Sequence, residues 1–237
     1  MRNFIISGFI LIFLTSCGND ENPKVSYPEN GKFESQELKK DSTLIEIADL
    51  PIHIDSTKYL IHPIGEYEIY GSGSSYFSSS SYGSGSFSVS GHNRYEISGN
   101  LYNLKFEEIE SETTRLLTNK NIRIKSVRFL NEIFEKTNEQ FLVYRILDKD
   151  TNRDKKLNDF DISTLYISNF DGTNFTKLTA EFHELIDWNA LPIKNRLYFR
   201  SIEDSNKNGD FDKEDKISYQ FIDLSDKDWI VKQYKPI

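Results

Sequence analysis

Oxygen-bearing side chains recur at one spacing in two twelve-residue stretches of this chain, 150–161 and 204–215. In both stretches Asp or Asn occupies positions 1, 3, 5, 9 and 12, and an apolar residue occupies position 8. This spacing lets one turn of backbone surround a hard cation such as Ca²⁺, which takes six to eight oxygen ligands at about 2.3–2.6 Å. The predicted side-chain ligands are Asp150, Asn152, Asp154, Asn158 and Asp161 in the first loop and Asp204, Asn206, Asn208, Asp212 and Asp215 in the second, with the backbone carbonyls of Lys156 and Asp210 at position 7.

The two loops differ at position 6, where the backbone of a calcium loop turns sharply. Gly209 occupies this position in the second loop, whereas Lys155 occupies it in the first and is expected to strain or reshape the turn. Calcium is therefore predicted at both sites, with the second site stronger. The alternative is that both stretches are acidic, solvated turns without an ion, because Asp and Asn are common turn residues.

Strand-like segments flank both loops. The chain repeats itself at an offset of 54 residues, and this offset aligns the flanks as well as the loops. The segments that enter the loops are 141–146 and 196–202, and those that leave them are 163–168 and 216–222. All four are rich in β-branched and aromatic residues and alternate in polarity, as strands do. Each loop is therefore predicted to lie at the tip of a β-hairpin.

The ligand spacing resembles that of the EF-hand and of the dockerin repeat, and Leu157-Asn158-x-x-Asp161 fits the dockerin form closely. An EF-hand carries an amphipathic helix on each side of its loop. Neither loop here has such a flank, so the resemblance implies the coordination pattern alone.

A second resemblance covers 164–179, which is similar to the blade repeat of TolB-type β-propellers. In that repeat a strand, an Asp-Gly turn and a second strand ending in Leu-Thr recur, and Asp171-Gly172 is a strong hairpin signal. A degenerate earlier copy can be traced through the segments 58–61, 100–104 and 113–118.

These patterns predict one all-β domain over 44–237, built of antiparallel, blade-like sheets. Three propeller-like repeats are expected, fewer than the four blades of the smallest closed propellers, so the domain would be a partial or truncated propeller. A Gly/Ser-rich insertion, 71–91, is interpreted as a mobile loop or a pair of ragged strands. Only around 180–190 does the spacing permit a helix, and a connecting segment that packs Trp188 into the core is favoured there. The expected repeats are 44–125, 126–180 and 181–237.

The amino terminus resembles a bacterial lipoprotein signal. Arg2 precedes an apolar run that is too short to span a bilayer comfortably and that ends in Leu-Thr-Ser-Cys17. The resemblance implies that 1–16 is removed and that Cys17 then carries lipid, including palmitate, on its sulfur and amino groups. The polar residues 17–43 are expected to form a flexible stalk after that anchor.

Gly18 resembles the residue that sorts lipoproteins to the outer membrane, and Asn19-Asp20-Glu21 resembles the export tags of surface lipoproteins in the Bacteroidetes. The protein is therefore expected to be lipid-anchored at the outer membrane, on its periplasmic or cell-surface side. The formal net charge of −8 argues against a nucleic-acid partner, because phosphates demand a basic face. One Cys excludes an internal disulfide framework.

Catalysis finds little support, and no catalytic residue is assigned. No Gly-x-Ser-x-Gly elbow, phosphate loop or dinucleotide fingerprint occurs. The acidic pair Glu107-Glu108 is interpreted as a charged strand end. No two of the four histidines have a zinc-like spacing. They are His53, His62, His92 and His183.

Two functional classes fit these patterns. In the first, the protein is a calcium-stabilised, membrane-tethered binding or scaffold module with a protein or glycan partner. In the second, it is a degenerate accessory component of a glycan-processing enzyme assembly, with calcium shaping a site. The second class predicts a concave pocket in which His and carboxylate side chains converge.

Overall fold

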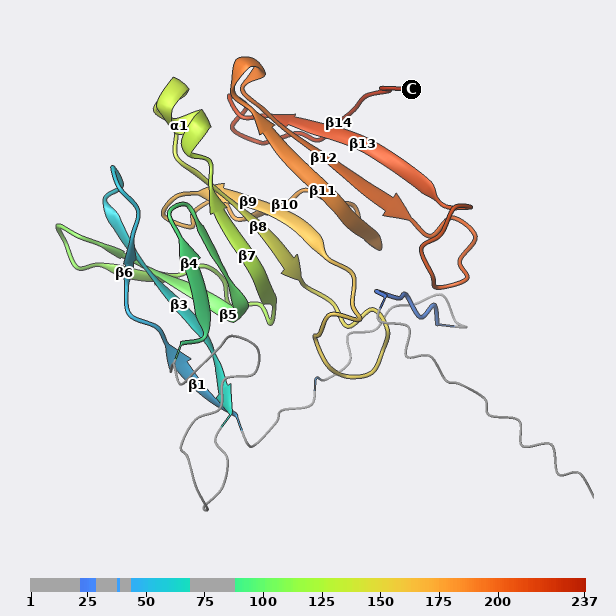
Figure 1. Cartoon of the computed structure of the whole chain (residues 1–237), viewed down its shortest axis with the longest axis horizontal. Helices are drawn as coiled ribbons and strands as arrows, with labels where there is room; N and C mark the ends of the chain where they lie inside the picture. The colour runs from blue at the N-terminus through green and yellow to red at the C-terminus, as the bar shows by residue number, and fades with distance from the viewer. Residues whose placement is uncertain (1–21, 29–37, 39–43, 69–87) are drawn as a thin grey trace, which may run out of the picture.

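The computed structural model describes residues 22–28, 38, 44–68 and 88–237 (Figure 1). Within these ranges the chain forms fourteen β-strands, one α-helix and one short 3₁₀ turn, so the predicted all-β class is confirmed. None of the helical segments in these ranges has the length and apolar character needed to cross a membrane. The leader 1–16, Cys17 and most of the Gly/Ser-rich insertion 71–91 lie outside the described residues.

The larger of two antiparallel sheets has the strand order β1-β3-β5-β7-β8-β9-β10. Three further strands join it at its first half, β2 on β3 and both β4 and β6 on β5. The strands are β1 (Leu44–Ala48), β2 (Ile52–His53), β3 (Tyr59–Glu68), β4 (Ser90–Asn93), β5 (Glu96–Glu108), β6 (Thr114–Leu116), β7 (Arg123–Phe129), β8 (Phe141–Leu147), β9 (Thr164–Asn169) and β10 (Thr176–Lys177).

Strand β5 joins the two halves of this sheet. Its first residues pair with β4 and β7, and its last residues pair with β3 and β6. Its pairing with β7 shifts register between Ser98 and Leu101, the kind of irregularity that bends a strand. Gly99 lies in this shift, where a Cβ would come within 2.5 Å of the Val89 carbonyl oxygen. The first two expected repeats therefore share one continuous sheet.

The smaller sheet has the order β11-β12-β13-β14 and falls within the third expected repeat, 181–237. Its strands are β11 (His183–Leu191), β12 (Arg196–Glu203), β13 (Lys216–Asp223) and β14 (Lys232–Gln233). In Figure 1 it stacks beside β8 and β9 of the larger sheet. A backbone hydrogen bond of 2.9 Å from Leu185 N–H to the Ser163 carbonyl links the two sheets near the first loop.

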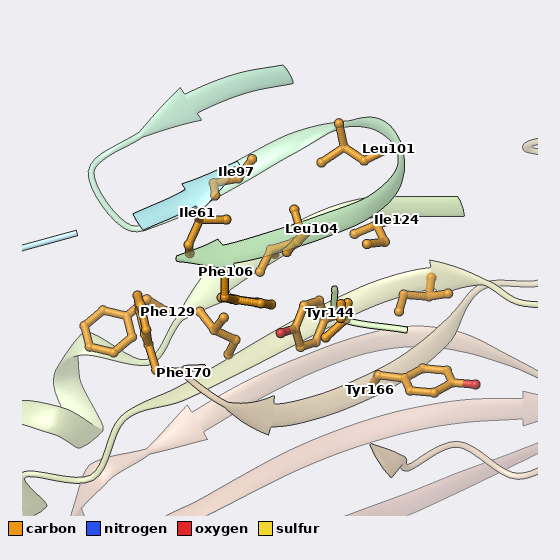
Figure 2. Packing of buried hydrophobic residues seen from close by; sticks show 14 of the residues in the cluster. Ile61, Ile97, Leu101, Leu104, Phe106, Ile124, Phe129, Tyr144, Tyr166 and Phe170 are labelled. Atoms are coloured by element: carbon orange, nitrogen blue, oxygen red, sulfur yellow. The ribbon is translucent and has the colours of Figure 1, made fainter. Parts of the chain in front are cut away.

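Two hydrophobic cores stabilise the fold, one formed within the larger sheet and one between the two sheets. Strands β8 and β9 contribute side chains to both cores. Alternate residues of β8 divide between them: Tyr144 joins the core within the larger sheet (Figure 2), whereas Val143 joins the core between the two sheets. In β9 Tyr166 and Ile167 divide in the same way. Because side chains alternate across a strand, burial on both faces requires a nearly continuous apolar sequence, and β8 has one.

The α-helix lies outside the one region, 180–190, where the sequence permitted a helix. Residues Asn131–Thr137 form α1, which ends at Asn138 in the left-handed conformation with φ 62°. The segment around 180–190, where a helix or a connecting segment was expected, is instead β11, because it pairs along its length with β12. Trp188 is half-buried at the edge of the core between the sheets.

Candidate metal centre

Both predicted calcium loops lie at the ends of antiparallel hairpins, as expected. Strands β8 and β9 pair on either side of the first loop, and β12 and β13 pair on either side of the second (Figure 1). No helix adjoins either loop. The predicted β9–β10 hairpin is also present, with Gly172 at φ 77° in its turn. The degenerate earlier copy corresponds to β3, β5 and β6, which pair with one another.

The carboxylate at position 1 organises the first half of each loop. It accepts the backbone N–H groups of positions 5 and 6, at 3.0 and 2.8 Å in the first loop. The corresponding distances in the second loop are 3.2 and 2.8 Å. Asp150 and Asp204 therefore have the same partners, each with one hydrogen bond to either carboxylate oxygen.

The carboxylate at position 12 closes each loop. It accepts the N–H groups of positions 2 and 9, at 2.7 and 3.0 Å for Asp161 and at 2.8 and 2.9 Å for Asp215. The hydroxyl groups of Thr151 and Ser205 at position 2 then accept the N–H of the residue after the loop, at 3.1 and 3.2 Å. These hydroxyl residues occur at the same place in both loops, a sequence signal that the ligand pattern alone does not use.

The remaining predicted side-chain ligands bind the backbone in the same way in both loops. The position 3 oxygen accepts the N–H of position 5 at 2.9 Å in each loop, and the position 5 oxygen accepts the N–H of position 7 at 2.8 Å in each. The position 9 oxygen accepts the N–H of position 11 at 2.9 and 2.7 Å. All ten predicted side-chain ligands thus accept at least one backbone N–H of their own loop.

The backbone conformations match as well. Positions 4 and 6 both have positive φ: 65° and 68° at Arg153 and Lys155, 58° and 93° at Lys207 and Gly209. Of the two effects expected of Lys155, reshaping of the turn does not occur, because the first loop keeps the same hydrogen bonds, and strain does. Lys155 instead adopts the left-handed conformation, which costs an L-residue about 1–2 kcal/mol.

Burial and charge distinguish the two loops. Asp161 is fully buried, and this burial raises the pKa of its carboxyl to about 6, against the opposing effect of its backbone hydrogen bonds; nearby Asp150 raises it further. In the second loop Asp204 is buried and Asp215 is half-exposed. The first loop has four acidic and three basic side chains, a net charge of −1, whereas the second has five and two, a net charge of −3.

The donor set of each loop suits a hard cation, because it contains carboxylate, amide and carbonyl oxygens and no nitrogen or sulfur ligand. Across the described residues, no three His, Cys, Asp or Glu side chains by themselves form a group that could hold a metal ion. A site in either loop would therefore depend on the Asn amides and the position 7 carbonyl as well as on the carboxylates. In the first loop the side chains at positions 5 and 9 already meet, with Asn158 Nδ2 donating to Asp154 Oδ2 at 3.1 Å.

Residues 22–28 lie against both loops, although the sequence predicted a flexible stalk there. We call them the N-terminal strap. In Figure 1 the strap runs between the first and the second loop. The Lys24 N–H donates to the Phe160 carbonyl of the first loop at 3.0 Å, and the Val25 N–H donates to the Gly209 carbonyl of the second at 2.9 Å. The only sequence signal for this contact is the strand-like Val-Ser-Tyr within a polar segment.

The histidines do not converge on one site. His53 Nε2 lies 3.1 Å from the Thr57 carbonyl, and His62 Nε2 lies 2.7 Å from Glu107 Oε2 on the neighbouring strand. His183 Nδ1 lies 3.3 Å from Ser201 Oγ, and burial lowers the pKa of its imidazole.

A cavity of about 400 Å³ lies between the larger sheet, the start of α1 and β11. Charged side chains of both signs, such as Arg128, Arg145, Glu132 and Asp187, share its wall with Trp188. None of the four histidines lines it. The cavity therefore lacks the pairing of His and carboxylate groups that an active site of the accessory-enzyme class was expected to have.

No protein-family model matches the chain, and no curated protein matches it. Among solved structures, the chain is similar to a protein assigned as TolB from Agrobacterium tumefaciens. The identity is 9%, the match covers 79% of this chain and 80% of the other, and the TM-score is 0.25. A TM-score this low does not establish a shared fold.

Proposed function

We propose that this protein is a calcium-binding lipoprotein of the outer membrane that acts as a binding or scaffold module. One observation carries the metal assignment: the two loops share the same hydrogen bonds at seven pairs of positions, although they lie in different sheets. Acidic turns selected only for solubility have no reason to repeat such a set.

The cost of each loop without an ion supports the same proposal. Each gathers three carboxylates among its five side-chain ligands, and like charges held close together repel. A bound Ca²⁺ would neutralise that charge, and it would stabilise the folded state by about 2.7 kcal/mol when free ion exceeds the dissociation constant a hundredfold. A surface module can thereby use calcium as a structural clamp.

The ranking of the two sites rests on charge and backbone. The second loop is more negative by two charges and has Gly209 at the left-handed position that Lys155 occupies at a cost in the first loop. More negative charge and less strain both favour a divalent cation. The second site is therefore proposed to bind calcium more strongly than the first.

The lipid anchor and the blade-like character belong to the same proposal. The signal over 1–16 and Cys17 supports a lipid anchor. The equivalent placement of the loops, at the ends of β8–β9 and of β12–β13, supports a tandem repeat of blade-like units. A module anchored in this way would bind its protein or glycan partner in the periplasm or at the cell surface.

Calorimetric titration of metal-free protein with Ca²⁺ tests the proposal directly, with thermal unfolding measured in parallel. The variants Asp204→Ala and Asp215→Ala should weaken calcium binding more than Asp150→Ala and Asp161→Ala. The variants Asp159→Ala and Glu214→Ala are matched controls, because each removes an acidic side chain at a non-ligand position of a loop. Absence of binding heat together with an unchanged melting temperature would end the calcium assignment, and equal losses in both loops would end the ranking.

A further inference from the structure

The N-terminal strap binds the two loops with alternate backbone groups. The N–H groups of Lys24 and Ser26 donate to carbonyls of the first loop, whereas the N–H of the intervening Val25 donates to the Gly209 carbonyl of the second. In an extended chain successive N–H groups point to opposite sides, so the strap bridges two loops that belong to different sheets. Ser26 adds a hydrogen bond from its hydroxyl to the Asn152 carbonyl at 3.0 Å.

Side chains strengthen the contact with the second loop. Val25 is 2% exposed, so its side chain is buried where the strap crosses the loops. Lys24 Nζ lies 3.2 Å from Asp210 Oδ1, and the Tyr27 hydroxyl hydrogen-bonds to the Asp204 side chain. Charge and hydrogen bonding thus join the strap to the more acidic of the two loops.

Each loop residue whose carbonyl accepts a strap N–H also donates its own N–H to a predicted calcium ligand. The Thr151 N–H donates to Asp161 at 2.7 Å, and the carbonyl of the same residue accepts the Ser26 N–H at 2.8 Å. In the second loop the Gly209 N–H donates to Asp204 at 2.8 Å, and its carbonyl accepts the Val25 N–H at 2.9 Å. The loop shape that the ligand carboxylates fix is therefore the shape to which the strap binds.

We infer that the two loops together form a docking surface for the chain's own residues 22–28, and that calcium binding and strap docking strengthen each other. This inference rests on the calcium binding proposed above. Because coupling between two binding events is reciprocal, any factor by which calcium favours the docked strap is also the factor by which the strap raises calcium affinity. Coupling of this kind typically amounts to between fivefold and 150-fold.

The coupling would set the distance between the domain and a lipid anchor at Cys17. Seven residue steps lead from Cys17 to Lys24, the first strap residue that is hydrogen-bonded to a loop, and seven steps span at most about 25 Å. When the strap is docked, the two loops must lie within that reach of the anchor. When it is released, 26 residues lie between Cys17 and β1, a span of up to about 90 Å. Calcium would thereby hold the domain close to the membrane.

Two measurements on the full mature chain from Cys17 test the inference. The first is hydrogen exchange at the Lys24, Val25 and Ser26 amides of the unmutated protein, with saturating Ca²⁺ or with a chelator. Exchange is expected to be at least tenfold faster in the chelator. The second is calorimetric titration of the Val25→Asp variant, whose charge cannot occupy the buried site, against Ile230→Asp, which changes an exposed apolar residue outside the loops and the strap. Val25→Asp should weaken calcium binding about tenfold, and Ile230→Asp should leave it unchanged.

The outcomes separate this inference from the function on which it rests. Calcium binding with equal exchange of the strap amides in both conditions would overturn the coupling and leave the calcium proposal standing. Equal calcium affinity in the unmutated and Val25→Asp proteins would do the same. Absence of binding heat in the unmutated protein would overturn both. The exchange measurement needs no variant, so its result holds even if Val25→Asp fails to fold.

Discussion

Replacing Gly209 by Ala tests how the second loop and the strap depend on each other. Gly209 has φ 93°, a conformation that costs an L-residue about 1–2 kcal/mol. A Cβ at this position would also lie 2.7 Å from the Val25 carbonyl oxygen, so the strap must move away. If Val25 leaves its buried site, a further 1.5–3 kcal/mol, roughly, is lost. We expect a total destabilisation between about 2.5 and 5 kcal/mol, which corresponds to a fall in Tm of roughly 5–20 °C for a chain of this size.

The matched control is Lys155→Ala at the same position of the first loop. It exchanges one L-residue for another at φ 68°, so we expect a change within about 0.5 kcal/mol. Chemical unfolding in a chelator measures both variants without any contribution from calcium. The cost of Gly209→Ala should also shrink to its conformational part when Val25→Asp is already present, because the clash with the strap is then absent. An equal cost for the two alanine variants, or an undiminished cost in the double variant, would refute the reasoning.

Other substitutions probe the sheets that carry the loops. Burial raises the pKa of Glu184 to about 7, above its usual 4.5, so the folded state favours the protonated carboxyl. This preference adds at most about 3 kcal/mol to the unfolding free energy. The stabilisation is complete below pH 4.5 and is lost as the pH rises through 7. Glu184→Gln should therefore flatten the decline in unfolding free energy between pH 5 and 7.5, and an unchanged pH profile would contradict this. Phe199→Ala should cost about 3–5 kcal/mol in urea unfolding, because Phe199 is buried in the core shared by both sheets, whereas Ile193→Ala, at a residue 80% exposed, should change little. Asn138→Gly should raise the unfolding free energy by up to about 1 kcal/mol, because glycine adopts the left-handed cap of α1 without strain, and a loss of stability would show that the Asn side chain matters more.

Residues close together in the sequence determined the hairpins and the form of the loops. Short runs of β-branched and aromatic residues predicted β8, β9, β12 and β13, although β8 and β9 are buried on both faces and only β12 and β13 alternate as half-buried strands do. The spacing over twelve residues selected oxygens that bind backbone N–H groups of the same loop, so the two loops share one hydrogen-bond pattern; calcium coordination by these oxygens stays a prediction. Local reasoning left open whether Lys155 would strain or reshape its turn; the surrounding hydrogen bonds decide for strain, because they hold this residue in a conformation that its type disfavours.

Contacts between distant residues decided the rest. The segment around Trp188 became a strand because β12 supplies its hydrogen-bonding partners, which no local pattern reveals. The joining of two expected repeats in one sheet depends on the pairing of β5 with β7 and of β7 with β8. The strap shows most clearly that distant contacts decide the structure, because Ser26 and Asn152 lie 126 residues apart. Nothing in a polar segment predicts which distant loops will accept its N–H groups. The sequence alone thus determined the chemistry that each loop offers, and only the tertiary structure brought the two loops and the amino-terminal segment together.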